Sequence, residues 1–170
     1  MGRKWFNILD SEKTYLVVRL ILGGIFVYSG SVKLLDLEAF SRIIEAWGMV
    51  PWKLLDPAAA GIASVELAAG IGLILDIRTS LGWITAMLLA FMALLSYGII
   101  MGYDIDCGCF GPSDPQAQAF NSLREALVRD AFMVAAAVFL YVWRLRNNHT
   151  PIPCIRSGRN LIEKKRKGIL

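Results

Sequence analysis

The chain has 170 residues, of which 56% are hydrophobic and 19% charged, and its mean hydropathy is +0.52. Soluble domains usually carry about a quarter charged residues, so this composition excludes an ordinary soluble globular protein. The length suits a single domain over residues 1–170. The formal net charge is +4, but basic residues also orient membrane chains, so we expect no nucleic-acid partner.

Four long apolar stretches dominate the hydropathy pattern. They cover residues 14–35, 57–75, 80–101 and 123–143. A helix needs about 20 mainly apolar residues to cross the hydrocarbon core, and backbone groups in lipid must pair within their own segment. The sequence therefore predicts an all-α integral membrane four-helix bundle in contact with the lipid bilayer.

The basic residues predict the orientation of the bundle. Arg3, Lys4 and Lys13 precede the first span, and residues 144–170 form a basic tail. The opposite side has few basic residues, namely Lys33, Arg42 and Lys53 around the first connection. Because basic segments stay in the cytoplasm, we expect both termini inside. A signal peptide is the alternative for the first span, but Arg19 interrupts its apolar run, so we expect the span to be retained.

Between the first two spans, apolar residues recur at helical spacing. Phe40, Ile43, Ile44 and Trp47 share one face, and Asp36 is placed to cap the helix at its start. We expect a short amphipathic helix on the outer side of the membrane. We expect it to lie on the membrane surface. The alternative is a lid over the mouth of the bundle, and the sequence does not separate these arrangements.

Charged residues inside the spans form a candidate cofactor-binding site. They are Arg19, Glu66, Arg129 and Asp130. A charge in lipid is costly, so such residues face the bundle interior and often mark a functional site. We expect Glu66 to be neutral or paired, and the group to line a polar cavity or a quinone headgroup site. The alternative is an interhelical salt-bridge network that specifies packing.

Small residues in the first two spans predict close helix contacts. Small side chains allow the backbones of membrane helices to approach one another. The residues concerned are Gly23, Gly24, Gly61, Ala68, Ala69, Gly70 and Gly72.

The connection after the third span carries the motif most suggestive of chemistry. Cys107 and Cys109 flank Gly108, which gives the backbone the freedom to close a small, strained disulfide. Strain raises the reduction potential, so we interpret the two cysteines as a candidate catalytic redox pair on the outer face. Such a location also suits a disulfide, because the compartment is oxidising.

Two other interpretations of this motif remain open. The disulfide could be purely structural, and Asp104 and Asp106 disfavour a neighbouring thiolate. A metal site would lack clear third and fourth ligands, so we expect no metal. The remaining cysteine, Cys154, belongs to the tail on the opposite side and is expected to be a free thiol.

These residues carry a resemblance to a known family. The chain resembles the MauE branch of the DoxX-like membrane proteins, named for methylamine utilisation, through all four spans. The most specific part is residues 106–111, Asp-Cys-Gly-Cys-Phe-Gly. Weaker supporting marks are Arg19, Gly23, Lys33, Pro57, Glu66, Arg129 and Asp130.

The resemblance implies a protein of the bacterial inner membrane that helps to mature disulfide-containing periplasmic proteins, often beside a thioredoxin-like partner. It implies that Cys107 and Cys109 are the redox pair, and that Arg19, Glu66 and Arg129 are intramembrane polar positions without an assigned step. Related DoxX-like proteins are linked to quinone chemistry, so quinone is the cofactor to consider.

The leading interpretation is thiol–disulfide exchange between the Cys107–Cys109 pair and a periplasmic thioredoxin-like protein, with the direction of electron flow open. The main alternative is a non-catalytic scaffold or chaperone subunit with a structural disulfide. A quinone-linked DoxX-like subunit and a small-molecule transporter that uses Glu66 are further alternatives, although the spans lack the broken helices typical of transporters.

Overall fold

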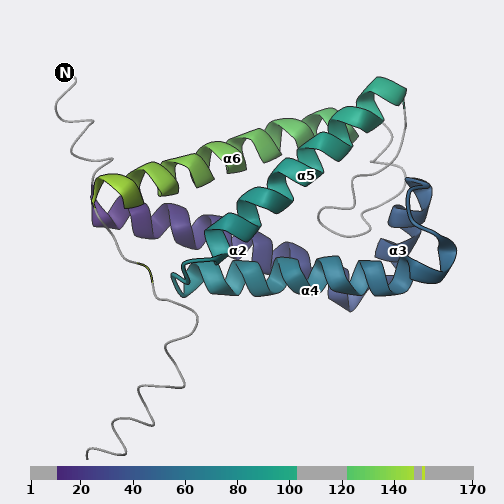
Figure 1. Cartoon of the computed structure of the whole chain (residues 1–170), viewed down its shortest axis with the longest axis horizontal. Helices are drawn as coiled ribbons and strands as arrows, with labels where there is room; N and C mark the ends of the chain where they lie inside the picture. The colour runs from purple at the N-terminus through teal and green to yellow at the C-terminus, as the bar shows by residue number, and fades with distance from the viewer. Residues whose placement is uncertain (1–10, 103–121, 148–150, 152–170) are drawn as a thin grey trace, which may run out of the picture.

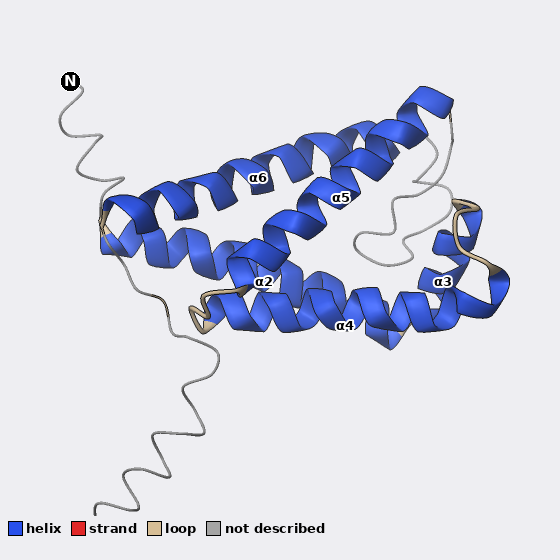
Figure 2. Cartoon of the chain, in the orientation of Figure 1, coloured by secondary structure: helices blue, strands red, loops and turns tan. Residues whose placement is uncertain are grey.

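The computed structural model describes residues 11–102, 122–147 and 151, and the structural statements below concern this part of the chain. Five α-helices and one 3-10 turn make up the fold (Figure 1). They are α2 (Glu12–Leu35), α3 (Leu37–Ala46), η1 (Trp52–Leu54), α4 (Leu55–Ile74), α5 (Ser80–Met101) and α6 (Ser122–Arg146). Within the described ranges the fold has no strand (Figure 2), so the predicted all-α bundle is confirmed.

The four long helices correspond to the four predicted spans. Each is long and apolar enough to cross a membrane. The second span begins earlier than predicted, at Leu55, which places Pro57 in the first turn of α4, where its missing N–H costs no hydrogen bond. The fourth span ends later, at Arg146, so that Arg144 belongs to the helix and not to the tail.

The bundle is built from two helix pairs. α2 makes its most extensive contact with α4, and α5 packs along α6 (Figure 1). A Cβ atom added at Gly30 would lie 2.7 Å from the backbone nitrogen of Leu67, and one added at Gly70 would lie 2.9 Å from the carbonyl oxygen of Gly23. Glycine is therefore what allows α2 and α4 to approach so closely.

The prediction of close glycine contacts was only partly right. Gly23, Gly70 and Gly72 do face neighbouring atoms, whereas a Cβ at Gly24 or at Gly61 would meet nothing within 4 Å. Gly24 and Gly61 therefore point away from the contact between α2 and α4. Successive residues of a helix point in directions about 100° apart, so a neighbour of a contact residue need not face the contact.

The two ends of the bundle differ. The start of α2, the α4–α5 turn and the end of α6 meet at one end, which we call the terminal end (Figure 1). The other end, which we call the α3 end, holds α3, the end of α5 and the start of α6. Many large apolar side chains face outward along the helices, among them Ile21, Ile100 and Phe132. An outer surface of this kind is suited to lipid.

α3 is a lid at its end of the bundle. Asp36 caps it as predicted, since its Oδ1 accepts a hydrogen bond of 3.1 Å from the backbone N–H of Ala39. Phe40 and Trp47 are buried, and the Trp47 ring packs where Gly98 leaves room on α5. The apolar face of α3 therefore packs against the bundle, which favours the lid over the expected position on the membrane surface.

Candidate functional site

A buried ion pair joins α2 to α4 beneath the lid. Lys33 Nζ donates to Glu66 Oε2 at 2.5 Å, and the two side chains are only 2% and 5% exposed. The ammonium group also lies 5.1 Å from the ring centre of Phe40 and 5.3 Å from that of Phe91, which are cation–π distances. The prediction that Glu66 faces the interior as a paired group is confirmed.

A second ion pair on α6 faces the first. Arg129 donates to Asp130 Oδ1 through Nε at 3.4 Å and Nη2 at 3.3 Å. The Arg129 side chain is 32% exposed, whereas that of Asp130 is 2% exposed. The other carboxylate oxygen of Asp130, Oδ2, is buried and has no hydrogen-bond partner. A buried carboxylate oxygen without a donor is costly, so it marks a position suited to a water molecule or a ligand.

A small cavity connects the two ion pairs. It has a volume of about 20 Å³, and its polar lining residues are Ser29, Lys33, Glu66, Arg129 and Asp130. Space of this size holds roughly one water molecule, which could donate to Asp130 Oδ2. We call Lys33, Glu66, Arg129 and Asp130 the Glu66 cluster. Two cations and two carboxylates give the cluster a formal charge of zero, which lowers the free-energy cost of burying it within the membrane.

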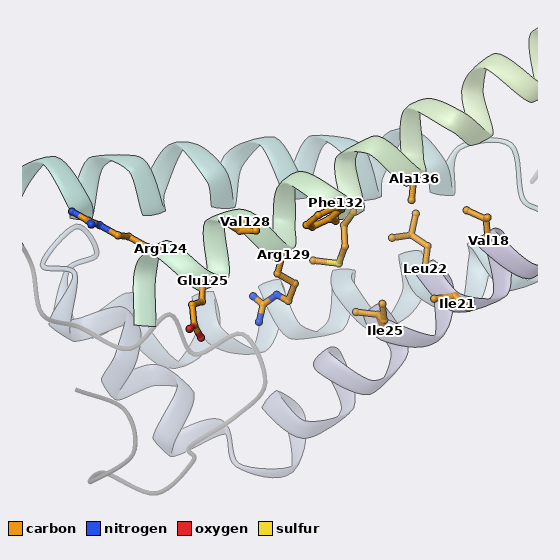
Figure 3. Close-up of a pocket in the computed structure, with 11 residues that line it drawn as sticks. Val18, Ile21, Leu22, Ile25, Arg124, Glu125, Val128, Arg129, Phe132 and Ala136 are labelled. Carbon is orange, nitrogen blue, oxygen red and sulfur yellow. The ribbon is translucent and has the colours of Figure 1, made fainter. Parts of the chain in front are cut away.

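A larger groove runs between α2 and α6 on the outside of this cluster (Figure 3). Its volume is about 740 Å³. The lining residues are Val18, Ile21, Leu22, Ile25, Arg124, Glu125, Val128, Arg129, Phe132, Met133 and Ala136. Arg129 is the charged residue that lines both the groove and the small cavity, so its guanidinium separates the buried cluster from the membrane side.

Arg19 does not belong to this cluster, which corrects the predicted grouping. Its Nη1 pairs with Asp76 Oδ2 at 2.9 Å, at the terminal end of the bundle. Arg19 precedes Lys33 by 14 positions on one helix, which corresponds to about 21 Å at 1.5 Å per residue. The prediction placed all the intramembrane charges in one group. The structure divides them between two sites.

Asp76 is the centre of the second site. Its Oδ1 accepts hydrogen bonds of 2.7 Å from both Tyr15 Oη and Arg144 Nη2, and Arg144 Nε donates to Tyr15 Oη at 2.9 Å. The Tyr15 ring stacks on Trp143 with 4.2 Å between ring centres. The site ties α2, the α4–α5 turn and α6 together, which is a structural role.

Four members of these sites, Tyr15, Lys33, Asp76 and Arg144, were not predicted from the sequence. Lys33 was assigned to the outer connection. It falls inside the apolar stretch 14–35, and this position in the sequence indicates that it belongs to the span. Asp76 was not singled out in the sequence, and Arg144 was assigned to the basic tail. A lone carboxylate between two spans, with basic residues at the ends of two others, was the signal for their pairing.

Cys107 and Cys109 lie outside the described residues, as does Cys154. The described helices that flank the first two are α5, which ends at Met101 where Gly102 adopts a left-handed conformation, and α6, which begins at Ser122. Both of these helix ends belong to the α3 end of the bundle (Figure 1).

Four long apolar helices with charges buried between them define a multi-pass membrane protein. The chain belongs to the family described as "Methylamine utilisation protein MauE", which it matches over residues 11–143. Comparison with curated proteins and with solved structures gives no match. The matched range covers all four helices, up to Trp143 near the end of α6, and the connection that carries Cys107 and Cys109.

Proposed function

We propose that the protein is a membrane thiol–disulfide exchange protein that acts through Cys107 and Cys109. Its partner is a periplasmic thioredoxin-like protein, and the exchange supports the maturation of disulfide-containing periplasmic client proteins. The observation that carries the proposal is the Cys-Gly-Cys sequence in the connection between two spans of a MauE family member. Membership in the family supports the membrane setting but does not assign the reaction.

The exchange proceeds through a mixed disulfide. A thiolate of the partner attacks one sulfur of the Cys107–Cys109 disulfide, and the other sulfur leaves as a thiolate. The second thiolate of the partner then attacks the mixed disulfide. The partner is left as a disulfide, and Cys107 and Cys109 have gained two electrons and, as thiols, two protons. The same steps in reverse deliver electrons to the partner.

A single pair of outer cysteines limits how Cys107 and Cys109 can return to their starting redox state after each exchange. The chain contains three cysteines, and Cys154 is expected on the opposite side of the membrane. A relay of two cysteine pairs therefore cannot run within one chain. Either the Cys107–Cys109 pair meets both the partner and a membrane electron carrier, or the thioredoxin-like protein supplies the second pair.

The proposed orientation places the α3 end on the periplasmic side of the inner membrane. The basic residues at the end of α6, Arg144 and Arg146, support it because positive residues favour the cytoplasm. The shared position of the start of α2 and the end of α6 is consistent with both termini on one side (Figure 1).

Cysteine replacement tests the proposal. Cys109→Ser should accumulate a mixed disulfide through Cys107 with a thioredoxin-like protein, seen as a reducible band on a gel and identified by mass spectrometry. Cys154→Ser is the matched control and should leave the exchange unchanged. The double variant Cys107→Ser/Cys109→Ser should lose client disulfides while the bundle still folds. Client disulfides that form normally in this variant would favour the scaffold alternative.

A further inference from the structure

The small cavity of the Glu66 cluster lies between three helices. Its volume is about 20 Å³, which admits one water molecule and excludes a lipid chain or any larger organic ligand. Its polar lining comes from α2, α4 and α6, through Ser29, Lys33, Glu66, Arg129 and Asp130. A molecule bound here would therefore contact all three helices.

Three groups around the cavity have hydrogen-bonding capacity left over. Arg129 reaches only Oδ1 of Asp130, at 3.3 and 3.4 Å, and the buried Oδ2 has no hydrogen-bond partner. Glu66 accepts from Lys33 through Oε2, and its Oε1 has no partner among the described residues. An ammonium group has three N–H donors, of which this bond uses one. The cavity is thus bordered by two acceptors and a donor.

A water molecule matches this set of groups. It can donate two hydrogen bonds and accept others, and a buried water typically makes about three. Two would go to Asp130 Oδ2 and Glu66 Oε1, and the water oxygen would accept one from Lys33 Nζ. All three groups belong to side chains that line the cavity.

The charges around the cavity exclude an ion. Lys33 and Arg129 already balance Glu66 and Asp130. A metal cation or an anion would add an uncompensated charge to the interior of a membrane bundle, which is costly. A neutral molecule adds none.

We propose that the Glu66 cluster binds one water molecule that bridges Asp130 of α6 to Lys33 of α2 and Glu66 of α4. The two ion pairs then form a single hydrogen-bonded network. Arg144 ties α6 to Tyr15 of α2 at the terminal end, and the water ties the same two helices nearer the α3 end. The bridge goes beyond the thiol exchange and does not depend on it.

A crystal structure of the full-length protein grown from a lipidic phase, at a resolution that shows ordered water, tests the site directly. We expect one density peak in the cavity, about 2.7–3.2 Å from Lys33 Nζ, Glu66 Oε1 and Asp130 Oδ2. A cavity without density would overturn the proposal. So would a Lys33 ammonium group that donates directly to Asp130 Oδ2.

Infrared spectroscopy separates the water from its main competitor, a proton bound to Asp130. The spectrum of Asp130→Asn in nanodiscs at neutral pH is subtracted from that of the wild type. We expect no C=O stretch of a protonated carboxyl group in the difference, because the water satisfies Oδ2 while the carboxylate keeps its charge. Glu38→Gln, which removes an exposed carboxylate, is the control and should also give no such band. A carboxyl band that is lost only in Asp130→Asn would overturn the bridge.

Displacement of the water tests what the bridge contributes. Ser29→Val places two methyl groups at the cavity and should expel the water, whereas Ser29→Ala leaves room for it. Thermal unfolding in nanodiscs should show a loss about 5 °C larger for Ser29→Val than for Ser29→Ala, since Oδ2 of Asp130 is then left without a donor. Ser31→Val and Ser31→Ala are the matched controls, because Ser31 lies on the same helix and does not line the cavity. Equal losses for the two Ser29 variants would contradict the bridging role.

Discussion

Lys33 and Glu66 form an ion pair of 2.5 Å in the interior of the bundle, between α2 and α4 and beneath the α3 lid. The two side chains are only 2% and 5% exposed, and the Lys33 ammonium lies beside the rings of Phe40 and Phe91. The desolvation of both groups is compensated only while both are present. The pair therefore makes the packing of α2 on α4 dependent on two specific side chains.

The first prediction is that the stability of the bundle depends on the Lys33–Glu66 pair. Glu66→Gln leaves the Lys33 ammonium buried without a counter-charge and should lower the free energy of unfolding by about 3–5 kcal/mol. Replacement of both residues together, as Lys33→Met/Glu66→Met, should recover most of that loss because neither charge of the pair is then left buried without its partner. Thermal unfolding in detergent measures both variants.

A surface ion pair provides the control. Glu38 on α3 pairs with Arg42 at 3.0 Å, and its side chain is 82% exposed. Glu38→Gln should change the free energy of unfolding by less than about 1 kcal/mol, because solvent screens exposed pairs. Equal effects of Glu66→Gln and Glu38→Gln would contradict the buried role of the Lys33–Glu66 pair.

The second prediction concerns Asp76. It adopts a left-handed backbone conformation with φ of 59°, which asparagine also tolerates. Asp76→Asn therefore keeps the turn but removes the charge that pairs with Arg19 and Arg144, and it should destabilise the bundle by about 3 kcal/mol or more. Asp56→Asn, at an exposed position in the first turn of α4, should have little effect. An unfolding temperature that is the same for both variants would refute the role of Asp76.

Close packing of α2 on α4 gives the third prediction. A Cβ at Gly30 would lie 2.7 Å and 3.0 Å from backbone atoms of Leu67 and Ala63, which cannot move aside as a side chain can. Gly30→Ala should therefore cost about 1–3 kcal/mol through overpacking. Gly24→Ala, on the open side of the same helix, should be neutral or stabilising by up to about 1 kcal/mol, since alanine favours helix. The reverse order of these two variants would show that the helices pack differently.

The spans could be predicted from the sequence because length and hydropathy alone determine them. Their ends were harder, since Arg144 looks like the beginning of a basic tail yet continues α6 and reaches Asp76. The inward position of Glu66 was also predictable, because a carboxylate in mid-span has no other stable place.

The partners of the buried charges were not predictable. Hydropathy gives no rotation of one helix relative to another, so nothing in the sequence assigned Lys33 to Glu66 or Arg19 to Asp76. The groove between α2 and α6 depends on how two helices diverge in space, and it leaves no pattern in either helix alone. The Cys-Gly-Cys motif was recognised from the sequence, and its chemistry stays a prediction.

The most direct test of thiol exchange is a redox titration of the Cys107–Cys109 pair in membranes. Thiols are trapped with a mass tag over a range of glutathione ratios, with Cys154→Ser as the background so that only Cys107 and Cys109 are counted. We predict a midpoint toward the oxidising side of the glutathione range, as expected for a strained and exchangeable disulfide. A pair that stays oxidised at every ratio would contradict the account and make the disulfide structural.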